Sequence, residues 1–327
     1  MRLLYITDTH IRGTSPRNRV DNFPDSLKIK LEEIVELLEE YQVDYMLHGG
    51  DFFDLPNPSL AVTSTFVNVF MKIPVPVFGI AGNHDIFAYN LGTLQRTMLG
   101  FLASLGVIKL LEPGEPVYLK KEGMTVQLTG QHFHHDIDRR DPLLDYAVKK
   151  KDCDLAIHMV HGMLLDRPFF PGARHTLIEK VAPFTEADYT LCGHAHLGFR
   201  DINSDGRFFI NPGAIARLTA HPAEITRVPQ VLLLDFNNGT PNTRKIKLKK
   251  SAPGKEVLNR GSIEMAAFQE QRLAQFVQGI KSSGDYHQGS LKEIIETIAK
   301  QEKLQSGVKE EALRRIGAIQ EQLSSGR

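Results

Sequence analysis

Residues 1–10 read MRLLYITDTH, a short apolar segment that ends in an aspartate, a threonine and a histidine. Positions 3–7 have the length and the apolar content of a buried β-strand. The first 85 residues repeat this arrangement, with amphipathic helical stretches between the strands. The expected elements are strands over 3–7, 45–47 and 75–80 and helices over 27–41 and 59–72. This βαβαβ order predicts parallel strands joined by helical crossovers.

The chain is expected to divide near residue 250. Further strands are predicted at 126–130, 155–160, 189–192, 207–210, 231–236 and 244–248. Residues 251–254 (SAPG) read as a linker, and beyond them only amphipathic helical patterns occur. We therefore expect an α/β domain over residues 1–250 and a helical tail over 251–327. The tail would either form a small capping bundle or dock onto another chain.

Charge and composition exclude several classes of protein. The 327 residues carry 39 basic and 39 acidic side chains, so the formal net charge is zero. A neutral chain has no general attraction for nucleic acid or anionic membranes, and any polyanion would have to be bound locally. No apolar run approaches the roughly 18 residues of a membrane span, and the N-terminus lacks a signal-peptide pattern. The only cysteines, Cys153 and Cys192, are far apart in sequence, which fits a reducing compartment. Together these features predict a cytoplasmic protein without a membrane segment.

Polar clusters follow five of the expected strands, and all contain side chains that bind hard or borderline metal ions. The candidate ligands are Asp8, His10, Asp51, Asn83, His161, His194 and His196. In an open α/β sheet the carboxyl ends of neighbouring strands line one crevice, so these side chains are expected to converge. Mixed oxygen and imidazole ligands suit manganese, iron or zinc. Seven ligands exceed one coordination sphere, so a bridging carboxylate would create a two-metal hydrolytic site.

Other histidines need an interpretation. His158 precedes His161 by three residues in the same expected strand, and alternation turns their side chains to opposite faces. His161, beside Gly162, is the favoured ligand, with His158 as the alternative. Residues 132–136 (HFHHD) are interpreted as an exposed strand end, with substrate contact as the functional alternative.

The five clusters match, in order, the motifs of the calcineurin-like metallophosphoesterases: D-x-H, G-D, G-N-H-[DE], H and G-H-x-H. The chain resembles this family over residues 1–250, and the resemblance implies a four-layer α/β/β/α sandwich, here with a C-terminal helical extension. Within the family, GDFFD at 50–54, PNPS at 56–59 and NPGA at 211–214 followed by Arg217 resemble the SbcD-type exonuclease subunits of DNA repair. The chain departs from that type after Lys250, where no mixed α/β capping domain is found.

The resemblance also implies roles for individual residues. One divalent ion would be held by Asp8, His10 and His196, the other by Asn83, His161 and His194, and Asp51 would bridge them. Metal-activated water would attack phosphorus, and His84 would protonate the leaving oxygen. Either Asp85 or Asp54 would orient His84.

The functional hypothesis is a DNA exonuclease or endonuclease that uses two divalent ions, manganese first, with iron or zinc as alternatives. The resemblance implies a homodimer and a partner ATPase of the coiled-coil SbcC type. A phosphoesterase for a cyclic nucleotide or another small nucleotide would use the same ions. A non-catalytic scaffold would retain only the fold. Because the chain is neutral, we expect it to bind DNA weakly and salt-sensitively when alone.

Overall fold

The computed structural model describes residues 1–170, 172–236 and 241–259, together with positions 261, 307, 308, 311, 314 and 315. The chain separates into two compact units, Met1–Ser262 and Ile263–Arg327. The helical stretches expected in the tail lie largely outside the described residues, so the helical tail remains a prediction. Every strand and helix named below belongs to the first unit.

The first sheet has six strands in the order β14-β13-β1-β2-β3-β4. In that order they span Asn242–Lys247, Gln230–Asp235, Arg2–Ile6, Tyr45–His48, Val77–Gly79 and Lys109–Leu110. Strands β1 to β4 are parallel, as the βαβαβ pattern predicts. Strand β13 runs antiparallel to both β1 and β14, so the sheet is mixed.

The second sheet also has six strands, in the order β11-β12-β10-β7-β6-β5. They span Ile202–Ser204, Arg207–Ile210, Tyr189–Cys192, Leu155–Val160, Met124–Gln131 and Val117–Lys121. The four central strands are parallel, and β11 and β5 close the edges as antiparallel hairpin strands. The sequence did not predict β5 because it is a half-exposed edge strand with only one fully buried side chain, Leu119.

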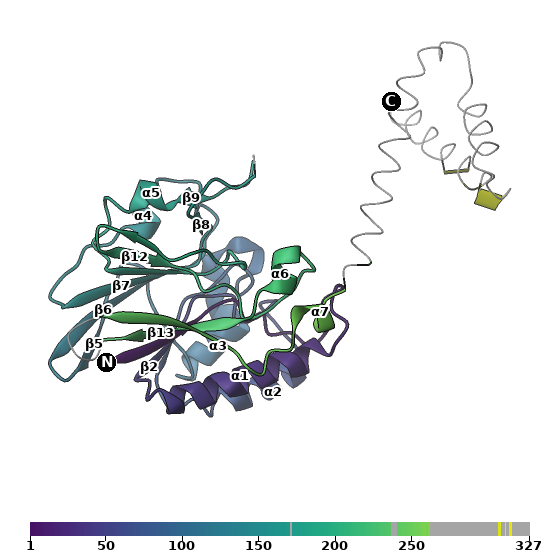
Figure 1. Cartoon of the computed structure of the whole chain (residues 1–327), viewed down its shortest axis with the longest axis horizontal. Coiled ribbons are helices and arrows are strands. Elements are labelled where there is room, and N and C mark those ends of the chain that lie inside the picture. The colour runs from purple at the N-terminus through teal and green to yellow at the C-terminus, as the bar shows by residue number, and fades with distance from the viewer. Residues whose placement is uncertain are drawn as a thin grey trace, which may run out of the picture. The chain divides into compact units, whose positions relative to one another are not determined.

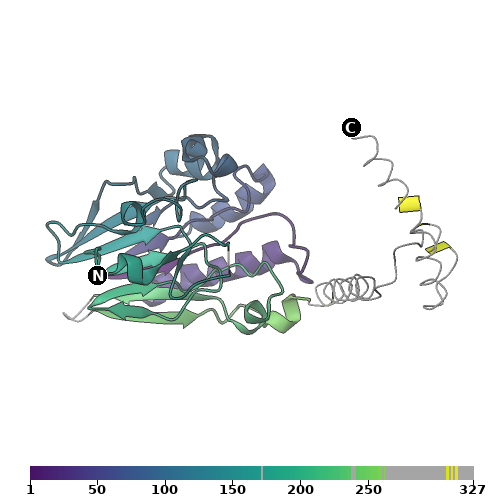
Figure 2. The same ribbon diagram turned by 90° about the horizontal axis from the view of Figure 1, so that it is seen from above.

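Helices cover the outer faces of both sheets and complete four layers (Figures 1 and 2). Helices α1 (Phe23–Glu40), α2 (Leu60–Phe70) and α3 (Met98–Ser104) pack on the first sheet. The short helices α4 (Leu143–Tyr146) and α5 (Ile178–Val181) pack on the second. The remaining short elements are η1 (Phe87–Tyr89), η2 (Leu91–Arg96), β8 (Leu164–Leu165) and β9 (Thr176–Leu177). The fold is therefore the α/β/β/α sandwich that the resemblance implied.

Strand β1 explains how the sequence specifies this layering. Its side chains alternate: Leu3 and Tyr5 belong to the core between the two sheets, whereas Leu4 and Ile6 belong to the core under the helices. All four are fully buried. A strand buried on both faces reads as a continuous apolar run, which is the pattern of residues 3–6.

Residues 251–258 differ from the expected linker. Helix α7 (Gly254–Val257) packs against α6 (Pro222–Thr226), and Val257 and Leu258 are buried. A Cβ on Gly254 would lie 2.1 Å from the carbonyl oxygen of Ile225, so only glycine permits this approach. The Pro-Gly pair therefore starts a packed helix instead of a free linker. No helix in the described part of the chain is long and apolar enough to cross a bilayer.

Packing between the sheets should control stability. Leu191 on β10 is fully buried in the core that joins the two sheets, so Leu191→Ala should lower the free energy of unfolding by about 2–5 kcal/mol. Leu144→Ala is the matched control, because the Leu144 side chain is 64% exposed and its loss should change stability by less than about 0.5 kcal/mol. Urea denaturation measures both variants; equal effects would contradict this account of the core.

Candidate metal centre

All the candidate ligands lie at the carboxyl ends of five strands, but these strands belong to two sheets. Asp8 and His10 follow β1, Asp51 follows β2 and Asn83 follows β3, all in the first sheet. The other three ligands, His161, His194 and His196, follow β7 and β10 in the second sheet. The two sheets present these ends at the same edge of the sandwich, so residues nearly 190 positions apart become neighbours.

The loops that carry the ligands have an unusual backbone. Asp8, His10, Asp51 and His194 have φ angles of 53°, 45°, 52° and 73°, in the left-handed region that non-glycine residues rarely adopt. Backbone hydrogen bonds hold two of these loops together: the Asp8 amide donates to the Gly50 carbonyl and the His10 amide to the Asp51 carbonyl, both at 3.0 Å. Strained backbone of this kind is typical of functional sites.

One group of side chains contains Asp8, His10, Asp51 and His196, whose ligand atoms lie within 4.8 Å of one another. The Nε2 atoms of His10 and His196 are 3.0 Å apart. The Asp51 Oδ2 atom lies 3.5 Å from His10 Nε2, and Asp8 Oδ1 lies 3.6 Å from His196 Nε2. These nitrogen and oxygen atoms face one common point, as ligands of a single ion do.

A second group contains Asp51, His161 and His194. The His161 Nε2 atom lies 3.3 Å from Asp51 Oδ2 and 3.2 Å from Asn83 Oδ1. Asp51 is thus common to both groups. A carboxylate shared by the two groups is the arrangement that a bridging ligand would need.

The donor set fits divalent ions. Asp51 Oδ2 is buried and has no hydrogen-bond partner, although a buried carboxylate oxygen is normally satisfied. The His161 Nδ1 atom donates to the Gly49 carbonyl at 2.7 Å, so Nε2 is the ring nitrogen that faces Asp51. A backbone carbonyl behind a ligating imidazole is the usual way in which proteins orient such a ligand.

The protonation states of the candidate ligands depend on burial and on one another. Burial is the main cause that lowers the pKa of His194 to about 4 and that of His196 to about 3, so both imidazoles are neutral near pH 7. Burial alone would raise the pKa of Asp51, but the imidazoles of His161 and His10 outweigh it and lower that pKa. Burial would lower the pKa of His161, but Asp51 outweighs it and raises that pKa to about 9. Metal ions bind neutral imidazole and ionised carboxylate, so binding of an ion at His161 would release a proton.

His84 is not one of the seven ligands, but with His10 and Asp54 it forms a third group whose possible ligand atoms lie within 4.8 Å of one another. Its amide donates to Asp51 Oδ1 at 2.8 Å, and its Nδ1 atom donates to the backbone carbonyl of Asp54 at 2.9 Å. The ring centroids of His84 and His10 are 4.7 Å apart. The group that orients His84 is therefore the backbone carbonyl of Asp54 and not, as we expected, the carboxylate of Asp85 or Asp54.

The two carboxylates expected to orient His84 have other partners. Asp54 forms an ion pair with Arg12 at 2.9 Å, and its Oδ1 atom lies 3.5 Å from His10 Nδ1. Asp85 accepts hydrogen bonds from the amides of Phe52, Phe53 and Gly82, at 3.0 to 3.2 Å for the two phenylalanines and 2.9 Å for the glycine. Asp85 thus fastens the loop after β2 to the loop after β3. Burial, and then Asp51, raise the pKa of Asp85 to about 7.

The other histidines lie away from the two groups. His158 is held by Thr129 Oγ1 at 2.9 Å and by the Asp145 carbonyl at 2.9 Å, on the opposite face of β7 from His161. His134 binds the Asp145 carboxylate, and His135 is exposed. Residues 132–136 contribute no ligand to the three possible metal-binding groups found among the described residues.

Sequence reasoning missed the supporting contacts. The Thr7 hydroxyl donates to Asp8 Oδ2 at 2.7 Å, and the Gly49 carbonyl accepts from His161. Glycine at 50 and 82 is also essential, because a Cβ there would lie 2.4 Å from His161 Nδ1 and 2.1 Å from Asp51 Oδ1. The only signal in the sequence was a glycine next to four of the seven ligands, namely Asp51, Asn83, His161 and His194.

Comparison with known proteins places this geometry in a family. The family model of the calcineurin-like phosphoesterases matches residues 1–198. The chain is 31% identical over 157 residues to the DNA double-strand break repair protein Mre11 of Methanosarcina acetivorans, covering 45% of this chain and 22% of the relative. It is 27% identical over 257 residues to the Mre11 protein of Archaeoglobus fulgidus, covering 72% of this chain and 54% of the relative.

The chain spans about half or less of the length of these two relatives. Among solved structures, GAP50, described as the anchor in the inner membrane complex of Plasmodium, is 12% identical over 77% of this chain and 86% of its own, with a TM-score of 0.46. The family model covers more than half of the chain. This protein therefore belongs to the calcineurin-like phosphoesterase family.

Proposed function

We propose that the protein is a metal-dependent phosphodiesterase that cleaves DNA, as the nuclease subunit of an SbcD-type repair complex. The observation that carries the proposal is the shared Asp51, which links two clusters of ligands at one edge of the sandwich. Similarity to proteins named for DNA double-strand break repair supports DNA as the substrate. Manganese is the first choice of metal, with iron or zinc as alternatives, because the ligands are oxygen and imidazole.

In this proposal Asp8, His10 and His196 hold one ion, Asn83, His161 and His194 hold the other, and Asp51 contacts both. When bound, such ions supply Lewis-acid stabilisation of charge on the phosphoryl group and a water that ionises near neutral pH. His84 acts on the leaving oxygen. Because its Nδ1–H is committed to the Asp54 carbonyl, Nε2 is the atom that can deliver a proton to that oxygen.

The proposal extends to the assembly. The resemblance to SbcD-type subunits implies a homodimer in the cytoplasm and a coiled-coil ATPase of the SbcC type as partner. Because its net charge is zero, one chain has little general attraction for the DNA backbone, so stable DNA binding would need such partners. Linking two binding modules raises the overall affinity by making the second contact intramolecular.

A substrate panel tests the activity. Labelled single-stranded and double-stranded DNA and a small phosphodiester are each incubated with the protein and Mn²⁺, with and without a candidate SbcC-type ATPase. We expect DNA cleavage that a chelator abolishes and added Mn²⁺ restores, because the ions supply the nucleophile. Turnover of the small diester alone would instead favour a phosphoesterase for small nucleotides. No turnover of any substrate would favour the non-catalytic scaffold.

The shared ligand provides a second test. Asp51→Asn keeps the shape of the side chain but removes the negative charge common to both clusters, so metal content should fall and phosphodiesterase activity should drop by more than about 100-fold. Elemental analysis and rate measurements check this. Asp205→Asn is the matched control, because Asp205 lies in the turn between β11 and β12 with φ 52°, which asparagine tolerates. Normal metal content in Asp51→Asn would refute the bridging role.

His84 provides a third test. His84→Ala should leave metal content unchanged and slow DNA cleavage by about 10²–10⁴-fold, because general acid catalysis contributes that much. A small diester with a nitrophenolate leaving group needs no proton, so its hydrolysis should slow much less. If both substrates slowed equally, or if metal were lost, His84 would not be the acid.

A further inference from the structure

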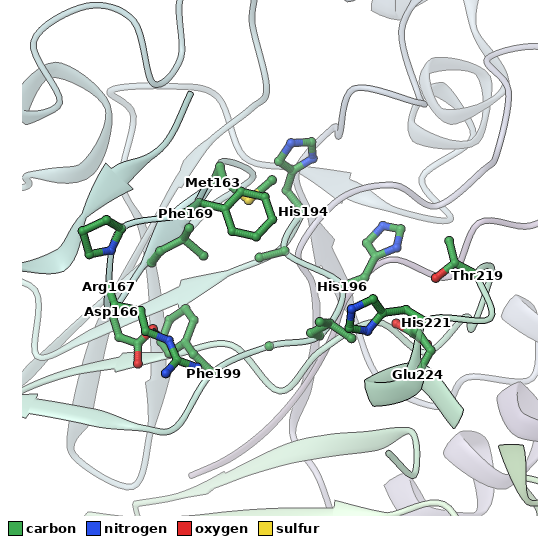
Figure 3. A pocket seen from close by; sticks show the side chains of 15 residues that line it. Met163, Asp166, Arg167, Phe169, His194, His196, Phe199, Thr219, His221 and Glu224 are labelled. Carbon is green, nitrogen blue, oxygen red and sulfur yellow. Dashed lines mark ion pairs between the residues drawn. The ribbon is translucent and has the colours of Figure 1, made fainter. Parts of the chain in front are cut away.

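A pocket of about 350 Å³ opens beside the metal centre, on the side of the second sheet (Figure 3). Its walls are mostly apolar and include Met163, Leu165, Phe169, Leu197 and Phe199. In Figure 3, Met163 and Phe169 lie at one side of the pocket, and His194, His196 and His221 at another. No step of the proposed reaction uses this pocket.

The pocket shares two walls with the candidate metal centre. His194 belongs to one of the ligand groups and His196 to the other, and both also line the pocket. A phosphodiester held at the centre would therefore have one of its two ester substituents directed toward this apolar space. The Phe133 ring, which does not line the pocket, also packs against His194, with the two ring centroids 5.7 Å apart.

The apolar side chains at this pocket are unusually exposed for their size. Phe169 is 50% exposed and Leu197 is 46% exposed, and the neighbouring Phe170, at 61%, has its ring centroid 4.7 Å from that of Phe169. Exposed apolar side chains that gather at a concave site mark a place where a ligand binds. Aromatic rings in particular stack with planar ligands.

The size and polarity of the pocket restrict the ligand. Its volume is at the lower end of the range of roughly 300–1,000 Å³ found for small-molecule sites, so it accommodates one aromatic group and no folded chain. Arg167, whose side chain is 86% exposed, lies at the lining, 3.9 Å from the Asp166 carboxylate. A guanidinium in that position can contact an adjacent phosphate, and the rings can stack on a base.

We propose that this pocket binds one unpaired nucleobase next to the phosphodiester bond that is cleaved. The inference rests on the proposed nuclease function and deepens it, because it makes single-stranded or locally unpaired DNA the substrate at the reacting bond. A base within a duplex is stacked on both faces and cannot enter such a pocket until it leaves the stack. Stacking on aromatic side chains accepts any base, so the pocket selects for strand state and not for sequence.

The test uses the full chain and a single-stranded oligonucleotide with one abasic nucleotide, and the products are mapped bond by bond with Mn²⁺ present. The parent protein should cleave a bond beside the abasic nucleotide about 10-fold more slowly than the same bond in the complete oligonucleotide, because one stacking contact is lost. Phe169→Ala should slow cleavage of the complete oligonucleotide by a similar factor and show no further loss at the abasic nucleotide. Phe169→Tyr should behave as the parent.

Phe184→Ala is the matched control, because Phe184 is 57% exposed and does not line the pocket. Binding is measured separately with a single-stranded oligonucleotide that contains 2-aminopurine, whose fluorescence falls when the base stacks on an aromatic ring. The parent, Phe169→Tyr and Phe184→Ala should quench this fluorescence, and Phe169→Ala should quench it much less.

The two readouts separate the pocket from the nuclease. If the parent cleaved no DNA but quenched 2-aminopurine through Phe169, the proposed function would fail and base binding would stand. If the parent cleaved DNA and Phe169→Ala matched it in both readouts, the nuclease would stand and the base pocket would be refuted. The base pocket would also be refuted by two results together. The parent would cleave duplex and single-stranded DNA at equal rates, and Phe169→Ala would lose a further share of its cleavage rate at the abasic nucleotide.

Discussion

The buried carboxylate of Asp51 is the constraint on which the rest of the site depends. A charged group inside a protein is costly unless opposite charges and hydrogen-bond donors surround it. Here the partners come from both sheets: His10 lies 3.5 Å from Oδ2 on the side of the first sheet, and His161 lies 3.3 Å from it on the side of the second. The charge is compensated only when the two sheets pack in this arrangement.

The strained loops follow from the same requirement. To bring Asp8, His10 and Asp51 to one point, the chain turns sharply after β1 and β2 and adopts positive φ at each of these residues, at a cost of order 1–3 kcal/mol each. Two sets of hydrogen bonds offset this cost: those between these two loops, and those that the Asp85 carboxylate accepts from three backbone amides. Hydrogen bonds within the protein therefore hold these loops in shape.

Backbone carbonyls orient two of the imidazoles at the site. The Gly49 carbonyl holds His161 and the Asp54 carbonyl holds His84. From the sequence we expected the carboxylate of Asp85 or Asp54 to orient His84, because carboxylates are the orienting groups that a sequence makes visible. Carbonyl oxygens occur at every residue, so their role becomes visible only when the loop conformation is known.

The pocket beside His194 and His196 was also invisible in the sequence. Its walls come from residues 163–169, 194–199 and 219–224, which follow different strands and show no common pattern. By contrast, the principal strands of both sheets and helices α1 and α2 were predictable, since their apolar periodicity reflects burial on one or two faces. Short edge strands such as β4 and β11 lack that periodicity because they bury few side chains.

The sequence by itself determined which residues end the buried strands, and with them the ligand types available for an ion. Alternation along β7 was enough to separate His161 from His158, because successive side chains of a strand point to opposite faces. Only the tertiary structure decided that the five strand ends belong to two sheets and meet at one edge. That arrangement depends on burial between β1, β2, β7 and β10, which are distant in sequence, and local periodicity does not encode the partner against which an apolar face packs.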